Sequence, residues 1–276
     1  MKIAVASGKG GTGKTTLAIN LALAAKSPVL LLDCDVEAPN AHLFLRGDLK
    51  RQHIVTIPVP EVDETKCDGC GMCSDFCAFN AIVSFGTVPV ISHEMCHGCG
   101  GCMRVCPQKA IHEIDKRIGV VETFSCDTIT LVQGKLDIGV ALAPPLIRAV
   151  KEEAQGDLVI IDAPPGTSCP VIATLREADF VVLVTEPTPF GLNDLRLAVD
   201  VVRELSLPFG VVINRAEKED ALVRPYLEAE KIALLASIPD DRRIAESYAK
   251  GQTIIDALPE YEDVFTKLLQ KIREAA

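Results

Sequence analysis

The chain has 276 residues, of which 48% are hydrophobic and 4% aromatic, and it carries 11 cysteines and a formal net charge of −10 at pH 7. This length suits one large domain or one domain with a small insert, and the acidic charge argues against bulk attraction to nucleic acid or to an anionic membrane. Its apolar runs are too short for a signal peptide or for a transmembrane helix of about 18 residues, so we expect a cytoplasmic protein whose cysteines bind metal rather than form disulfides.

The N-terminal segment has the predicted order strand, loop, helix, strand. Residues 2–6 (KIAVA) and 29–33 (VLLLD) are short apolar runs typical of buried strands, and residues 15–25 (TTLAINLALAA) have a helical pattern. This order is typical of an α/β sheet. Because aromatic residues are few, the core must consist mainly of Val, Ile, Leu and Ala, which suits a parallel sheet covered by helices.

The loop between the first strand and the helix carries a phosphate-binding motif. The residues from Gly8 to Thr15 fit G-x-x-x-x-G-K-[ST], in which glycines let backbone N–H groups point at phosphate oxygens beside a helix N-terminus. Lys14 is expected to neutralise phosphate charge and Thr15 to hold Mg²⁺. The same residues also fit the dinucleotide fingerprint G-x-G-x-x-G, with Asp33 as its acidic residue, but that alternative gives Lys14 and Thr15 no role.

From about residue 61 the sequence becomes rich in cysteine and glycine. Two runs with the spacing C-x₂-C-x₂-C-x₃-C begin at Cys67 and Cys96. This spacing is that of bacterial ferredoxins with two 4Fe–4S clusters, in which the fourth cysteine of each run ligates the other cluster. The resemblance implies one ligand set of Cys67, Cys70, Cys73 and Cys106, and a second set of Cys96, Cys99, Cys102 and Cys77.

Two details qualify this interpretation of the cysteines. Ala78 stands where a proline usually follows the fourth cysteine, which alters local packing but removes no ligand. Zinc is the alternative metal, because C-x₂-C pairs are common zinc ligands. Two identical runs of four cysteines exceed what a zinc ribbon requires, and this favours iron–sulfur clusters.

Beyond about residue 118 the α/β pattern returns. The expected strands of this part are 158–166, 180–187 and 209–214, and the expected helices are 192–205 and 259–274. The sequence therefore predicts a doubly wound, mostly parallel α/β sheet formed by residues 1–60 and 118–276. A small α+β ferredoxin-like domain of residues 61–117 is expected to interrupt it.

Several motifs together resemble one family of P-loop ATPases. The run KGGTGKTT, with Lys9 second in the loop, resembles the deviant Walker A motif of the MinD/ParA family, which includes Mrp-type iron–sulfur carriers. The segment from Asp33 to Asn40 is similar to that family's switch I, and the segment from Asp162 to Gly166 is similar to its Walker B and switch II. The resemblance spans residues 1 to about 255 and implies ATP and Mg²⁺ as cofactors.

The resemblance implies a role for each matched residue. Lys9 would reach across a nucleotide-dependent homodimer to the partner's phosphates, and Asp35 would position the attacking water, so the catalytic residues would be Lys9, Lys14 and Asp35. Asp162 would bind Mg²⁺ through a water, and the Gly166 amide would sense the γ-phosphate. The expected nucleotide-binding residues are Gly8, Lys9, Gly10, Gly11, Thr12, Gly13, Lys14, Thr15, Thr16, Asp162, Gly166, Asn214, Arg215, Pro239 and Asp240.

Cys169 lies just past the predicted switch II. The nitrogenase iron protein, a member of the same family, has a cysteine in a similar place that helps bind a cluster bridging its dimer. By this resemblance, Cys169 with Cys126 would hold a third, subunit-bridging cluster or receive a cluster as cargo. The alternative is a buried free thiol.

Three functions fit these motifs. The first is ATP-gated electron transfer from the clusters to an unidentified redox partner protein. The second is an ATPase for iron–sulfur assembly or metallocentre maturation that acts on a client protein, although the C-terminal C-x-x-C of Mrp-type carriers is absent. The third is a MinD-like positioning ATPase with structural clusters. For the segment 259–274, mixed charges favour a docked helix over a membrane-targeting one.

Overall fold

The computed structural model describes residues 1–216 and 221–276. The chain divides into two compact units. The first consists of Met1–His53, Val121–Lys135 and Ile147–Ala276, and the second of Ile54–Val120 and Leu136–Leu146. Two long strands, β3 (Asp48–Val62) and β6 (Ile111–Cys126), contribute residues to both units.

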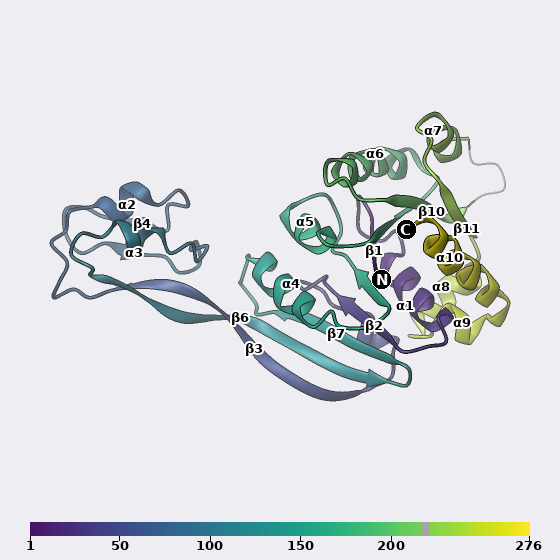
Figure 1. Ribbon diagram of the computed structural model, residues 1–276, viewed down its shortest axis with the longest axis horizontal. Helices are drawn as coiled ribbons and strands as arrows, with labels where there is room; N and C mark the ends of the chain where they lie inside the picture. Colours follow the sequence, from purple (N-terminus) through teal and green to yellow (C-terminus); the bar gives the residue numbers. More distant parts are fainter. Residues whose placement is uncertain (217–220) are drawn as a thin grey trace. The chain divides into compact units, whose positions relative to one another are not determined.

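A mostly parallel sheet organises the first unit. Its other strands are β1 (Lys2–Ala6), β2 (Val29–Asp33), β7 (Ile129–Leu136), β8 (Val159–Asp162), β9 (Phe180–Thr185), β10 (Phe209–Ala216) and β11 (Leu234–Pro239). In the described part of the chain the sheet has nine strands in the order β11-β10-β9-β1-β8-β2-β7-β6-β3 (Figure 1). The strand β1 pairs in parallel with β8 on one side and with β9 on the other. The predicted α/β fold with a mostly parallel sheet is confirmed.

Helices cover both faces of this sheet, as the doubly wound prediction requires. The helices are α1 (Lys14–Ala24), α4 (Ala143–Glu152), α5 (Cys169–Leu175), α6 (Pro189–Glu204), α7 (Val223–Ala229), α8 (Arg242–Ala249), α9 (Ile254–Ala257) and α10 (Glu262–Ala275). Helices α1 and α10 lie together on one face, whereas α5 packs on β1 and α6 on β9 from the other face (Figure 1). Short 3₁₀ turns at Ala41–Leu43 and Pro259–Tyr261 complete the elements.

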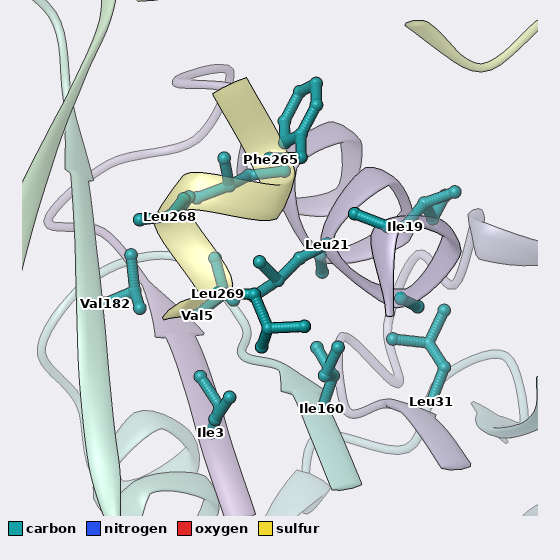
Figure 2. Packing of buried hydrophobic residues seen from close by; sticks show 14 of the residues in the cluster. Ile3, Val5, Ile19, Leu21, Leu31, Ile160, Val182, Phe265, Leu268 and Leu269 are labelled. Carbon is teal, nitrogen blue, oxygen red and sulfur yellow. The ribbon is translucent and has the colours of Figure 1, made fainter. Parts of the chain in front are cut away.

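The main core lies between the sheet and the helices α1 and α10. Side chains two apart on a strand share a face, so Ile3 and Val5 of β1 both point at these helices (Figure 2). Their partners in the core include Leu31, Ile160 and Val182 from the sheet, Ile19 and Leu21 from α1, and Phe265, Leu268 and Leu269 from α10. The predicted C-terminal helix is confirmed as a docked helix, because its apolar face is buried here. None of the helices in residues 1–216 and 221–276 combines the length and the apolar character needed to cross a membrane.

The β6–β7 hairpin was not predicted. Only Asp127 and Thr128 separate the two strands, and Asp127 adopts a φ of 51°, which suits a tight turn. Strand β7 pairs in parallel with β2, so it extends the sheet beyond the strands that the sequence identified. Its partner lies about a hundred positions earlier in the chain, a distance over which local patterns carry no signal.

The second unit is small and has a core of its own. Its short elements are α2 (Met72–Phe76), β4 (Ile82–Val83), β5 (Val90–Ile91) and α3 (Gly101–Val105). The strands β4 and β5 pair antiparallel, with Ile82 opposite Ile91. The buried core consists of Cys73, Ile82, Cys102 and Ile111, so cysteines of both runs lie inside it.

Candidate functional site

A cavity of about 380 Å³ lies in the first unit at the carboxyl ends of the parallel strands. Open α/β sheets bind ligands at this edge. Most of the predicted nucleotide-binding and catalytic residues line it, namely Gly10, Gly11, Gly13, Lys14, Thr15, Thr16, Asp35, Asn214, Arg215, Pro239 and Asp240. Gly8, Lys9, Thr12, Asp162 and Gly166 are not among its lining residues.

Gly13, which immediately precedes α1, needs to be glycine for two reasons. Its φ is +91°, in the left-handed region that costs other residues energy. A Cβ atom there would lie 2.4 Å from Nδ2 of Asn214. That Nδ2 donates a hydrogen bond of 2.8 Å to the carbonyl oxygen of Thr12. Asn214, near the end of β10, therefore fixes the phosphate loop that follows β1, and only a glycine leaves room for it.

Replacement of Gly13 by alanine is expected to weaken both folding and nucleotide binding. The left-handed backbone alone costs about 1–2 kcal/mol, and the new methyl group also displaces the Asn214 amide from the loop. Thermal melting of the nucleotide-free protein and binding of a fluorescent ATP analogue measure the two effects. Gly10→Ala is the matched control for melting, because its Cβ would meet no atom within 4 Å. A Gly13→Ala protein that melts and binds like the wild type would contradict this account of the loop.

Thr15 and Asp162 form a pair of oxygen ligands beside the cavity. The Thr15 hydroxyl donates to Oδ2 of Asp162 at 2.5 Å. Asp162 is 1% exposed, and among the described residues no group bonds to its buried Oδ1. Burial raises the pKa of Asp162, the Asp33 charge raises it further, and the Thr15 hydrogen bond opposes the shift. A buried carboxylate with one unpaired oxygen next to a hydroxyl is a donor set that fits Mg²⁺.

Lys14 and Asp35 place opposite charges in the same cavity. Lys14 is 7% exposed, and burial lowers the pKa of its ammonium group while Asp162 and Asp35 oppose the shift. Burial raises the pKa of Asp35, and Lys14 opposes that shift. The charges of Asp162 and Asp35 therefore favour the charged form of the Lys14 side chain. A nucleotide phosphate that entered the cavity would bring further negative charge close to this buried ammonium group.

Asp33 is a site residue whose role sequence reasoning missed. It is 0% exposed and accepts hydrogen bonds from the backbone N–H groups of Asp35 at 3.1 Å, Asn40 at 3.0 Å and Ala41 at 3.1 Å. Burial raises the pKa of Asp33 to about 6, and these backbone hydrogen bonds limit the rise. One carboxylate thus holds both ends of the loop that carries Asp35. An acidic residue ending an apolar strand was the available signal, but Asp33 was assigned only to the dinucleotide alternative and to the segment similar to switch I.

The helix α8 supplies a further wall of the cavity that the sequence did not indicate. Asp241, Ile244 and Tyr248 line the cavity from this helix and its N-cap. The Tyr248 ring lies 4.9 Å from that of Phe44, just after the loop held by Asp33. The wall therefore contacts the chain that follows Asp35.

Two predicted site residues have partners within their own chain. Nζ of Lys9 lies 3.3 Å from Oε2 of Glu186, a residue that the sequence did not single out. The N–H of Gly166 donates to the carbonyl oxygen of Ser7 at 3.0 Å. Both contacts would have to break before Lys9 and Gly166 could act on a nucleotide as the resemblance implies.

The second unit has two cavities lined by cysteines. One cavity is lined by Cys77, Cys96, Cys99 and Cys102, and the other is lined by Cys67, Cys70, Cys73 and Cys106. Each takes three cysteines from one run and the fourth from the other run. The structure thus brings together the two sets that the sequence predicted as ligand sets. In residues 1–216 and 221–276, no three His, Cys, Asp or Glu side chains are grouped so as to hold a single metal ion.

Backbone N–H groups point at the cysteine sulfurs of these cavities. The N–H of Ala81 donates to Sγ of Cys77 and that of Ala110 to Sγ of Cys106, both at 3.3 Å. Four glycines of the runs adopt positive φ, which lets the chain curl around the sulfurs; they are Gly69, Gly71, Gly98 and Gly100. Such N–H···S hydrogen bonds stabilise thiolates and tune the potential of an iron–sulfur cluster, so these cavities fit that cofactor.

The remaining cysteines lie in the first unit in different environments. Cys169 is exposed and begins α5. Cys126 is 6% exposed, and its thiol donates to the carbonyl oxygen of Leu45 at 3.9 Å within the main core. Cys34 is fully buried. Cys169 is therefore accessible, contrary to the buried-thiol alternative, whereas Cys126 is not available to share a surface ligand site with it.

Comparison with known proteins supports the nucleotide site. Residues 3–254 match the family model described as the CobQ/CobB/MinD/ParA nucleotide binding domain. An uncharacterized protein of Methanocaldococcus jannaschii is 33% identical over 262 residues, which cover 92% of this chain and 91% of the relative. The iron-sulfur cluster carrier protein of Pyrococcus furiosus is 26% identical over 307 residues, covering 99% of this chain and 87% of the relative. The septum site-determining protein MinD of Pyrococcus horikoshii, solved with Mg-ADP, shares the fold, with a TM-score of 0.63 and 22% identity over 98% of this chain and 95% of that chain.

Proposed function

Because the chain belongs to the CobQ/CobB/MinD/ParA nucleotide-binding family and is a P-loop ATPase, we propose that its ATP cycle gates electron transfer from two 4Fe–4S clusters to a partner protein. The observation that carries the proposal is the presence of both kinds of site in one chain. The first unit holds the nucleotide cavity, and the second holds two cavities with four cysteines each. When bound, each cluster supplies one-electron redox chemistry.

One buried cysteine in each set supports clusters that stay in the protein rather than clusters carried as cargo. Cys73 and Cys102 are each 8% exposed and belong to the small core of the second unit. Of the other six, Cys70 and Cys99 are exposed and four are half-buried. Each cavity also draws on both runs, so ligation ties the two halves of the unit together. A cluster held in this way is a structural part of its unit, and its release would disturb that core.

The residues of the nucleotide cavity have the chemistry that an ATP-driven switch requires. The loop amides and Lys14 would bind the phosphates, Thr15 and Asp162 would hold Mg²⁺, and Asp35 would position the attacking water. The Gly166 N–H would exchange the Ser7 oxygen for the γ-phosphate, which gives two alternative states of the segment after β8. Lys9 would reach the phosphates of a second copy, so the ATP-bound form would be a homodimer.

Cluster assembly is the second candidate function, and one observation favours it. The carrier protein of Pyrococcus furiosus is similar over 99% of this chain. A positioning function that depends on a membrane-targeting C-terminal helix has less support, because the apolar residues Phe265, Leu268 and Ile272 of α10 are buried against the sheet.

A single anaerobic experiment separates electron transfer from cluster transfer. The dithionite-reduced protein is mixed with a one-electron dye acceptor or with an apo-ferredoxin, each with and without Mg-ATP. Electron gating predicts faster dye reduction with Mg-ATP and no loss of iron from the protein. Movement of iron to the apo-ferredoxin, with dye reduction unaffected by Mg-ATP, would support assembly instead.

We also propose that Cys169 binds a cluster shared between two copies of the chain, since this thiol is exposed at the start of α5, just after the Gly166 segment. Cys169→Ser is then expected to lower the iron content of the ATP-bound dimer but not that of the nucleotide-free protein. Iron analysis of both forms, before and after reconstitution, measures this. Equal iron contents in the ATP-bound dimers of the wild type and of Cys169→Ser would rule out a bridging cluster at Cys169. Cys126→Ser serves as the control because that thiol is buried.

A further inference from the structure

Glu186 lies just beyond β9 and contacts two cations of the first unit. Its side chain is 10% exposed. Oε2 lies 3.3 Å from Nζ of Lys9 in the phosphate loop, and Oε1 lies 2.8 Å from Nη1 of Arg215 at the end of β10. Each carboxylate oxygen therefore has its own cation. Neither the family match nor the sequence motifs assign this glutamate a role.

The two cations differ in how closely they contact the carboxylate, because Nη1 of Arg215 donates a hydrogen bond of 2.8 Å to Oε1, whereas Nζ of Lys9 lies 3.3 Å from Oε2. Arg215 adopts a φ of +51°, and its N–H donates to Oδ1 of Asn214 at 3.0 Å. Asn214 in turn donates to the carbonyl oxygen of Thr12, so this side of the network is continuous with the wall of the nucleotide cavity. No other ion pair is recorded for the Lys9 ammonium in the described structure, and its flexible stem allows it to swing.

This difference between Arg215 and Lys9 determines whether Glu186 is left without a positive partner when Lys9 moves away. A carboxylate as buried as that of Glu186 is costly to leave without a positive partner. If Lys9 departs, Arg215 still compensates the charge, so the departure leaves no unpaired buried ion. The carboxylate can thus hold Lys9 in one state and release it in another, while Arg215 stays in place in both.

We propose that Glu186 is a positioning residue for Lys9, which it holds within its own subunit until a second copy brings nucleotide phosphates within reach. The inference rests on the proposed function, in which Lys9 acts across a nucleotide-dependent dimer. Phosphate oxygens then replace Oε2 as the partner of the ammonium group. Because the Lys9–Glu186 ion pair must break before two copies associate, a stronger pair makes dimerisation less favourable. Glu186 thereby determines how much of the protein must be bound to nucleotide before dimers form.

Glu186→Gln tests this proposal, because the amide keeps the shape and an oxygen acceptor for Arg215 but loses the charge. Sedimentation of the anaerobically purified protein with Mg²⁺ and a non-hydrolysable ATP analogue gives the dimer dissociation constant. We expect it to fall about fivefold or more, since a partly exposed ion pair contributes a factor of roughly two to five and two pairs break per dimer. Nucleotide affinity under dilute, monomeric conditions should not change. Glu186→Asp, which keeps the charge, should restore much of the wild-type dissociation constant.

The Lys9→Ala background shows whether Glu186 acts through the lysine. There, adding Glu186→Gln should leave the dissociation constant unaltered, whereas a structural role of Glu186 would shift it as much as in the wild type and overturn the proposal. If the wild type dimerises and Glu186→Gln has the same dimer dissociation constant, the inference about Glu186 is wrong but the proposed dimer stands. A wild-type protein that stays monomeric with the analogue would overturn the proposed dimer, and the inference with it.

Discussion

Lys14→Ala is expected to lower ATP turnover by at least about 100-fold. Losses of this size follow the removal of one preorganised donor that stabilises the charge of a transition state in a buried site. Lys14 is 7% exposed and lines the cavity together with Asp35, and the buried carboxylate of Asp162 lies beside the cavity. Without its ammonium group, phosphates entering the cavity would face these two carboxylates with one counter-charge fewer. ATP affinity should fall as well, because Lys14 contacts the phosphates in the ground state as well as in the transition state.

Steady-state ATPase assays and binding of a fluorescent ATP analogue measure the two losses separately. Lys50→Ala is the matched control, because Lys50 is an exposed lysine of the first unit whose recorded ion pair is with Asp48. Thermal melting must show that the Lys14→Ala protein is folded. A folded variant that hydrolyses ATP at the wild-type rate would mean that the cavity is not the site of hydrolysis.

Cys77→Ser is expected to remove iron from the cavity of the other cysteine run. Cys77 is the last residue of the first run but lines the cavity with Cys96, Cys99 and Cys102. The iron content should therefore fall from about eight to about four atoms per chain, the amounts held by two clusters and by one. The EPR signal that remains should be that of the cluster held by Cys67, Cys70, Cys73 and Cys106.

Comparison with two further variants tests whether each cluster takes its fourth ligand from the other cysteine run. Cys102→Ser removes a ligand from the same cavity as Cys77, and Cys73→Ser removes one from the other cavity. Cys77→Ser should thus lose the same signal as Cys102→Ser and retain the one that Cys73→Ser loses. Ligation run by run would give the reverse pairing. Cys126→Ser controls for loss of a thiol in the first unit and should keep all the iron.

The fold and much of the site could be predicted because their signals are local. Gly8 to Thr15 form one continuous motif between a strand and a helix, and the structure has β1 and α1 on either side of it. The cysteine spacing likewise predicted which four side chains gather in each cavity. In both cases the chemistry demands residues at fixed short separations, and the sequence displays those separations directly.

The features that escaped prediction depend on contacts between distant segments. The Lys9–Glu186 pair joins two loops that follow different strands, and no pattern around Glu186 marks it. Asp33 ends a predicted strand, but its hydrogen bonds to the loop up to Ala41 follow from how that loop folds back. Asn214 was expected to bind the nucleotide, and the structure adds a hydrogen bond to the phosphate loop. Its amide retains one N–H and one lone pair for a base, so both roles are compatible.

The central claim is that nucleotide at the first unit changes the redox behaviour of the second. The most direct test is an anaerobic potentiometric titration of the EPR signals of the reduced protein with and without Mg-ATP, on the wild type and on Lys14→Ala. The account predicts that Mg-ATP shifts the midpoint potential or alters the signal in the wild type and does neither in Lys14→Ala. Identical titrations of the wild type with and without Mg-ATP would contradict it.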